Sequence, residues 1–255
     1  SAPFAVQASA AWSPDGSQLA FFENSGLPQL MVFDFNTGVS TAVASANGSL
    51  LSVSWASNDR LVYSSAVGGY NEMMWVSLGT NQSGVLLGGE SNFVAPSVGP
   101  NGSLSYYSDL TIATEPAQFL NGYGSYDIWT SAADGSNATF QFDTVLLSEA
   151  QPGVFTNVPY VPGAMDLTSP PAWSPGGNEI AYSASNPLFT ALFIWNVGNW
   201  TTSSIGPVQL GVSALQPAWS PDGANIAFSC NLSGTYHIWA ISAAGGTVTQ
   251  QFPGY

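Results

Sequence analysis

Hydrophobic and polar residues alternate along this chain in short runs. The runs 18–23, 180–183 and 226–229 carry large apolar side chains at every second position, and each follows a turn rich in Ser, Pro and Gly. Alternation with a period of two residues is typical of β-strands, and clusters of Pro, Asp and Gly mark the turns between them. The pattern therefore predicts an all-β fold.

The same turn-and-strand unit recurs along the chain. Clear copies occupy 11–22, 172–183 and 218–229, weaker copies occupy 54–64 and 97–108, and a second strand-like run follows each copy, at 30–34, 73–76, 127–130, 193–196 and 237–240. Eight of the nine tryptophans stand at two equivalent positions of these repeats. We expect these indoles to fill the wedges between neighbouring sheets. A repeat of roughly 40 to 45 residues built from short strands predicts a β-propeller.

The clear copies contain the turn Trp-Ser-Pro-Asp-Gly or a close variant of it. Its proline presets φ, Asp15 and Asp222 can bond to the backbone, and the next glycine accepts a positive φ, so the aspartates are expected to be structural. This turn, followed by an Ile-Trp strand, resembles the repeat of TolB-like, WD40-like (PD40-type) β-propellers across nearly the whole chain. The resemblance implies the fold. Such propellers mostly bind proteins or serve as gating lids.

We predict a single propeller domain with five blades of four antiparallel strands, named a to d outward from the axis. The blades are expected at about 8–46, 49–90, 93–142, 170–212 and 214–255. Six blades are the alternative. A sixth would have to come from 141–169, which is short and contains Pro152, Pro159 and Pro162, and proline cannot donate to a sheet ladder. An insertion is therefore expected there.

A second insertion is expected in blade 3, at about 109–125. In a four-stranded blade the b–c and d–a loops leave from the same face, so the two insertions should emerge side by side as a contact surface for a partner. Four aromatic residues of this surface are predicted to contact the partner: Phe119, Tyr123, Phe155 and Tyr160. Five carboxylates accompany them: Asp109, Glu115, Asp143, Glu149 and Asp166.

The charge of the chain is unusual. Fifteen acidic residues face one arginine, Arg60, and one histidine, so the net charge is −14 at pH 7 and charged residues make up only 6% of the sequence. Binding of nucleic acid or of an anionic membrane is excluded, because both need many basic side chains. So few charges favour an acidic exterior, or a surface covered by sugar or by neighbouring subunits. Both settings predict an extracellular location.

Six Asn-x-Ser/Thr sequons fall in predicted turns, and we predict N-linked glycans on them. They are Asn47, Asn81, Asn101, Asn137, Asn199 and Asn231. The start Ser1-Ala-Pro is expected to be a mature end that remains after removal of a signal peptide. The sequence contains no run of about 18 apolar residues, so we predict no membrane insertion.

The sequence offers little catalytic chemistry, and we predict no enzyme and no cofactor. The only histidine, His237, begins an Ile-Trp strand, and Cys230 lies alone in an apolar run that should bury it. Metal sites built on His or Cys are excluded by count. A Ca²⁺ site made of carboxylates and a carboxylate pair for glycoside cleavage remain open, because their geometry depends on the fold.

The leading hypothesis is a glycosylated extracellular structural protein that self-assembles, as a homo-oligomer or polymer, into a cell-surface filament or surface layer. The apolar stretch 2–7 could add to a neighbour's sheet. The alternative is a secreted TolB-like module that binds a protein or glycan, and the third is a propeller hydrolase or lyase. We also expect tolerance to acid, because mutual repulsion among unpaired carboxylates should raise their pKa and protonation should relieve it.

Overall fold

The structure is a computed structural model, and it describes residues 9–23, 26–45, 48, 50–110, 127–142, 169–185, 189–207 and 209–251. All regular elements in these ranges are β-strands, which form five sheets. The strands are β1 (Ala10–Trp12), β2 (Gln18–Glu23), β3 (Gln29–Asp34) and β4 (Val39–Ser45); β5 (Leu50–Ser57), β6 (Arg60–Val67), β7 (Tyr70–Ser77) and β8 (Ser83–Leu87); β9 (Phe93–Val98), β10 (Ser103–Ser108), β11 (Asp127–Ala132) and β12 (Thr139–Phe142); β13 (Ala172–Trp173), β14 (Glu179–Ser185), β15 (Thr190–Asn196) and β16 (Thr201–Ser204); β17 (Ala214–Trp219), β18 (Asn225–Cys230), β19 (His237–Ser242) and β20 (Thr249–Gln250).

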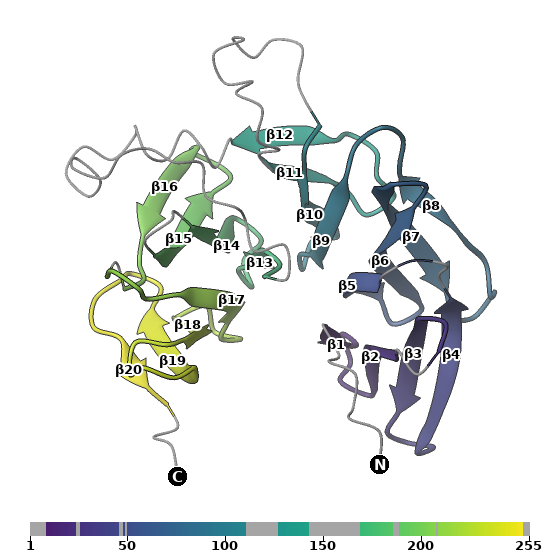
Figure 1. The fold of residues 1–255 in the computed structure, drawn as a ribbon, viewed down its shortest axis with the longest axis horizontal. Coiled ribbons are helices and arrows are strands. Elements are labelled where there is room, and N and C mark those ends of the chain that lie inside the picture. The colour runs from purple at the N-terminus through teal and green to yellow at the C-terminus, as the bar shows by residue number, and fades with distance from the viewer. Residues whose placement is uncertain are drawn as a thin grey trace.

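Each sheet is one blade whose four strands follow one another in chain order with antiparallel pairing. The five sheets lie around a common centre with their first strands, β1, β5, β9, β13 and β17, innermost (Figure 1). The prediction of an all-β propeller with five four-stranded blades is thereby confirmed. Residues 143–168, where a sixth blade was considered, lie outside the described ranges.

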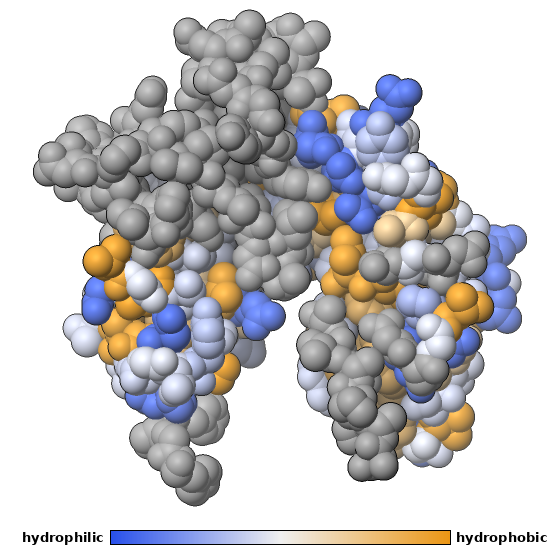
Figure 2. Space-filling model, viewed as in Figure 1, coloured by the Kyte–Doolittle hydropathy of each residue, from blue (hydrophilic) through white to orange (hydrophobic). Residues whose placement is uncertain are grey.

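The blades form an open arc. Strands of each blade pack against the next blade along the chain, and across the described strands no extensive packing joins blade 5 to blade 1. Figure 1 places these two blades at opposite ends of the arc, and the space-filling view shows open space between the two ends (Figure 2).

The turns between strands a and b owe their shape to the residues that the sequence singled out. In blade 1, Ser13 Oγ donates to Asp15 Oδ1 at 2.7 Å, the Ser17 amide donates to the same oxygen at 3.0 Å, and Gly16 has a φ of 72°. In blade 5, Ser220 Oγ donates to Asp222 Oδ1 at 2.6 Å in the same arrangement. The aspartates are therefore structural, as expected, because their oxygens hold the turn backbone.

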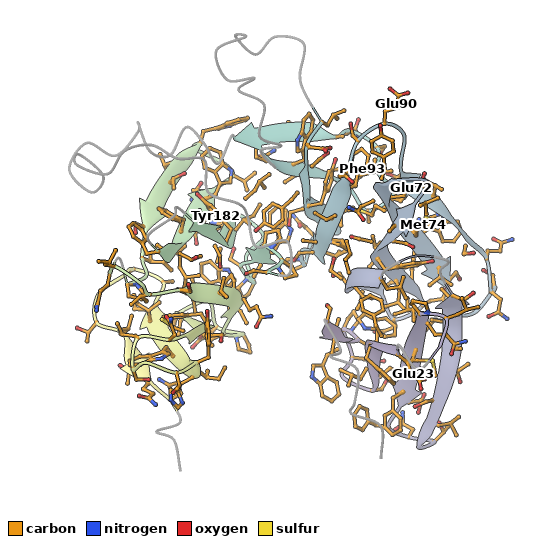
Figure 3. All side chains as sticks on the ribbon, in the orientation of Figure 1. Glu23, Glu72, Met74, Glu90, Phe93 and Tyr182 are labelled. Carbon is orange, nitrogen blue, oxygen red and sulfur yellow. The ribbon has the colours of Figure 1, made fainter. Side chains whose placement is uncertain are left out.

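Four apolar clusters fill the joints between neighbouring blades. Phe93 and Tyr182 lie inside two of these joints, where they meet Tyr106 and Phe193 at ring-centroid distances of 6.0 and 5.6 Å (Figure 3). Each fully buried large side chain contributes about 1.5–3 kcal/mol relative to leaving it exposed. Burial of these side chains in the joints therefore stabilises the packing of neighbouring blades.

Most of the repeated tryptophans are in these joints, as predicted. Trp55, Trp129 and Trp195 are buried, at 5%, 4% and 5% exposure. The prediction is wrong for Trp12, which is 58% exposed because blade 1 has no described blade packed on that side. Outside the joints, the sole arginine, Arg60, places its guanidinium 4.5 Å from the centre of the Trp75 ring, as a cation–π pair.

Candidate functional site: the axial pocket and the two loop faces

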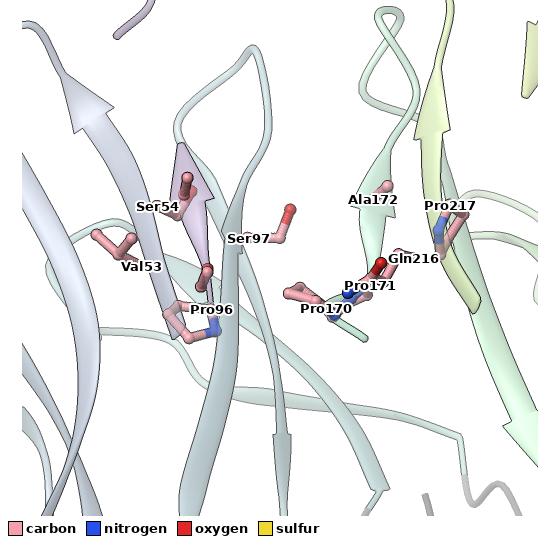
Figure 4. Close-up of a pocket in the computed structure, with 11 residues that line it drawn as sticks. Val53, Ser54, Pro96, Ser97, Pro170, Pro171, Ala172, Gln216 and Pro217 are labelled. Carbon is pink, nitrogen blue, oxygen red and sulfur yellow. The ribbon is translucent and has the colours of Figure 1, made fainter. Parts of the chain in front are cut away.

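The innermost strands enclose a pocket of about 390 Å³ at the centre of the arc (Figure 4). Every blade contributes one lining residue from the same position of the repeat. The reference point is the repeated strand-a residue, called the register position, which is tryptophan in four blades and Val98 in blade 3, and the lining residue lies two residues before it. These residues are Ala10, Val53, Pro96, Pro171 and Pro217. Proline is tolerated there because strand a is the edge strand of its blade and needs no N–H on that side. The three aligned prolines were a sequence signal for the pocket that the repeat analysis did not use.

Two residues beside the pocket have a left-handed backbone. Ala95 and Gln216 each have a φ of 55°, and each stands immediately before a pocket-lining proline. Strand pairing shifts register at both points, which marks a β-bulge in strand a of blades 3 and 5. A bulge bends its strand and re-aims neighbouring side chains, so the pocket wall owes its shape to these two irregularities.

Buried serines of the preceding blade hold both bulges. Ser52 Oγ accepts the Ala95 amide hydrogen at 3.0 Å and lies 3.3 Å from Ser64 Oγ. Ser169 Oγ accepts the Gln216 amide hydrogen at 2.7 Å and lies 3.2 Å from a second serine hydroxyl, that of Ser183. Because these hydroxyls are buried, the bonds link neighbouring blades rigidly beside the pocket.

The pocket is chemically neutral. Its described lining consists of Ser, Ala, Val, Pro and Gln, and none of these side chains titrates. Hydroxyl, amide and carbonyl groups beside apolar carbon can hold a neutral peptide or sugar segment, whereas acid–base or nucleophilic catalysis needs an ionisable or activated group.

The two residues with the most reactive side chains are in structural positions. Cys230 is fully buried in the joint between blades 4 and 5, and burial raises the pKa of its thiol, which keeps it protonated. His237 Nε2 lies 2.8 Å from Thr235 Oγ1 at the start of β19. No group of three or more His, Cys, Asp or Glu that could hold a metal ion occurs in the described part of the chain.

The loop face carries the b–c and d–a connections. At its base, Asp109 Oδ1 accepts the backbone amide hydrogen of Asn92 at 2.6 Å, and Asp109 Oδ2 accepts the Asn92 side-chain amide at 2.7 Å. This carboxylate therefore anchors its own blade at the start of the b–c loop. The other residues of the predicted contact surface lie outside the described residues: Phe119, Tyr123, Phe155, Tyr160, Glu115, Asp143, Glu149 and Asp166.

The turn face carries the a–b and c–d connections and four sequon asparagines. Asn81, Asn101, Asn137 and Asn199 lie between β7 and β8, β9 and β10, β11 and β12, and β15 and β16, and all four are exposed. Successive turns of an antiparallel sheet alternate between its two ends, so these four share one face of three neighbouring blades. At Asn199 the Thr201 hydroxyl donates to the side-chain amide oxygen at 2.6 Å. This bond does not involve the amide nitrogen, which is the atom that would carry a glycan.

The remaining two sequons differ. Asn47 lies outside the described residues. Asn231 is on the loop face and half-buried, where its Oδ1 accepts the Ser213 amide hydrogen at 2.7 Å and its Nδ2 donates to the Gly211 carbonyl at 3.2 Å. A glycan on that nitrogen would compete with the second bond.

The expectation that repulsion raises carboxylate pKa values is wrong for four turn aspartates. Hydrogen bonds lower the pKa of each below its usual value: those from Ser17 and Ser13 at Asp15, from Thr37 and Gln18 at Asp34, from Ser136 at Asp134, and from Ser220 and Ala224 at Asp222. Donors that bond the ionised form favour it. Acid therefore removes a stabilising contribution at these turns instead of relieving strain.

The geometry defines a five-bladed β-propeller, and solved structures share the propeller fold. TolB from Acinetobacter baumannii is similar over 93% of this chain at 16% identity and a TM-score of 0.63. A chain from a nidogen/laminin complex is similar over 95% of this chain, at 12% identity and a TM-score of 0.65. An oligogalacturonate lyase solved with manganese is similar over 94% of this chain, at 14% identity and a TM-score of 0.59.

These likenesses establish the fold, and they include an enzyme as well as a protein solved in a protein–protein complex. The chain spans about half of the Acinetobacter TolB chain, 52%, and covers 78% of the nidogen/laminin chain and 62% of the lyase chain. No protein-family profile and no curated protein sequence matches the chain. Among the described residues, no helix has the length and apolar character needed to cross a membrane.

Proposed function

We propose that this protein is a glycosylated extracellular building block that assembles with copies of itself into a cell-surface filament or layer. The observation that carries the proposal is the turn face, on which four exposed sequon asparagines lie in three neighbouring blades of a chain with 6% charged residues. Glycans there would supply the solubility that charge usually provides. The loop face carries one sequon among the described residues, Asn231, and its amide nitrogen is engaged in a hydrogen bond.

Electron microscopy of the native material tests the assembly. Ordered polymers or sheets of one protein are expected, and a field of dispersed single particles at high protein concentration would overturn the proposal.

Glycopeptide mass spectrometry tests the glycan face. Because the chain has a single basic cleavage residue, Arg60, chymotrypsin is the suitable protease. We expect high occupancy at Asn81, Asn101, Asn137 and Asn199 and the lowest occupancy at Asn231, whose amide nitrogen is engaged. The matched substitutions are Asn199→Gln, expected to leave stability unchanged, and Asn231→Gln, expected to cost about 1 kcal/mol through its lost backbone bonds. Polypeptide without any glycan would contradict the proposed surface.

A secreted binding module is the second candidate, and the neutral axial pocket favours it. Its test is the substitution Ser97→Trp, which fills the pocket from strand a of blade 3. If the pocket is the functional site, calorimetry against a panel of neutral oligosaccharides and short neutral peptides shows binding to the parent and none to the variant. If assembly is the function, the variant polymerises like the parent.

A further inference from the structure

The joint between blades 4 and 5 has an asymmetric design. In each blade, the face that looks back along the chain, here the leading face, presents large side chains; in blade 2 these include Trp55, Leu61 and Tyr63. The opposite face, the trailing face, differs from blade to blade: its second strand presents the small Ala181 and Ser183 in blade 4, but Phe22 in blade 1 and Tyr107 in blade 3. The joint between blades 4 and 5 thus packs bulky side chains of blade 5 against small ones of blade 4.

A hydrogen bond of fixed type closes these joints. The indole Nε1 of Trp55 donates to the Ala11 carbonyl at 2.9 Å, that of Trp173 to Ser97 at 3.3 Å, and that of Trp219 to Ala172 at 3.0 Å. The acceptor each time is the residue just before the equivalent register position of the preceding blade. Three joints therefore use the same donor and the same acceptor position.

Blade 1 carries a leading face that no described blade covers. Strand pairing places Trp12 beside Leu19, Leu19 beside Phe33, and Phe21 beside Met31, which is the arrangement of the filled joints. Leu19, Phe21 and Phe33 are half-buried and Met31 is 9% exposed.

The exposed edge of this face consists of aromatic rings. Trp12, 58% exposed, stacks on Phe35 at 5.0 Å, and Phe35, 51% exposed, meets Phe33 edge-on at 4.8 Å. No described residue accepts a hydrogen bond from the Trp12 indole, although this donor is used in three joints.

Blade 5 carries the matching trailing face. Ala227 pairs with Ala240 and Ser229 pairs with Ile238, and none of these four is fully buried; Ile238 is 43% exposed. Ala227 and Ser229 stand in the repeat where Ala181 and Ser183 stand in blade 4, and those two are buried under blade 5. The carbonyl of Ala218, just before Trp219, stands at the acceptor position.

We propose that the leading face of blade 1 docks onto the trailing face of blade 5 of a second copy of this chain, with Trp12 Nε1 donating to the Ala218 carbonyl. The two faces lie at opposite ends of one open arc, where they are separated from each other (Figures 1 and 2). The side chains named for the two faces are uncharged, so contacts among them carry no cost of desolvating an ion. A head-to-tail contact between two different faces repeats from copy to copy, which makes a ring or a filament.

This inference rests on the proposed self-assembly and names the surfaces that perform it. The test uses the secreted, glycosylated chain in sedimentation velocity over a concentration series. Trp12→Ala should raise the apparent dissociation constant at least about tenfold, because a central aromatic anchor is lost. Trp200→Ala is the matched control: that indole is 57% exposed, in the turn between β15 and β16, and its removal should leave the apparent dissociation constant unchanged.

A mixing experiment tests the head-to-tail polarity. Trp12→Ala disables only the leading face, and Ala240→Arg disables only the trailing face, so each variant alone should remain monomeric. Mixed in equal amounts, they retain one good face each and should form dimers that grow no further. A contact between two identical faces, or through other surfaces, would give no such complementation.

The outcomes separate the two proposals. If both variants assemble like the parent, the docking proposal is wrong while self-assembly stands. If the parent itself stays monomeric at every concentration, the proposed function fails. A third outcome is that Trp12→Ala is monomeric and its melting temperature falls as much as that of a variant with a substitution in a buried joint. The faces would then be covered within one chain, by each other or by another segment, and the docking proposal would be overturned.

Discussion

Trp55 and Trp12 stand at the same position of the same repeat, yet one is 5% exposed and the other 58%. Trp55 packs in the joint between blades 1 and 2 and bonds to the Ala11 carbonyl, whereas Trp12 rests on Phe35 at the free end of the arc. The residue is the same and only the neighbouring blade differs. Burial in a repeat protein is therefore a property of the joint, which needs two adjacent repeats.

The largest expected difference is in stability. Trp55→Ala should lower the free energy of unfolding by about 3–5 kcal/mol, because it empties a buried site and leaves the Ala11 carbonyl without its donor. Trp12→Ala in the monomer should change it by about 0.5 kcal/mol or less. Urea unfolding of both variants at low protein concentration measures this. Equal losses would show that the leading face of blade 1 is covered within the chain.

A smaller contrast compares two serines in equivalent positions. Ser183 lies in the joint between blades 4 and 5, with its Oγ 3.2 Å from Ser169 Oγ, whereas Ser229 is half-buried on the free trailing face. Ser183→Ala should cost about 1 kcal/mol through the lost buried hydrogen bond, and Ser229→Ala close to none. The measurement is the free energy of unfolding of each variant relative to the parent. A loss at Ser229 comparable with that at Ser183 would contradict an uncovered trailing face on blade 5.

The smallest expected effect is that of pH on the turns. The pKa values of Asp15 and Asp222 are lowered in the folded chain by serine and backbone hydrogen bonds. Their stabilising contribution is full above the unfolded pKa and is lost as pH falls through the folded one, so melting temperatures should decline modestly below about pH 4.

Replacing each aspartate in turn by asparagine provides the control for this pH effect. Asp15→Asn and Asp222→Asn should each flatten that decline. A melting temperature that rises as pH falls below 4 would restore the idea that repulsion among carboxylates dominates.

Several features were predictable because they depend on local chemistry. The copies of Trp-Ser-Pro-Asp-Gly and the alternating strands determine the turns, the strand order and the five blades, and Asp15 behaves as its turn position predicts. The hydrogen bonds at the base of the loop face were less predictable. Asp109 is bound to Asn92 across a gap of 17 residues, a pairing that no local pattern reports.

The sequence by itself determined the repeat, the fold class, the shortage of charge and the positions of the sequons, because each is written in neighbouring residues or in composition. Only the tertiary structure decided which repeated positions meet a partner: the ring of Pro96, Pro171 and Pro217 around the pocket, the bonds that engage Asn231, and the exposure of Trp12. The physical reason is that desolvation, packing and hydrogen bonding belong to pairs of surfaces, and the closure of those pairs depends on how the blades are arranged in space.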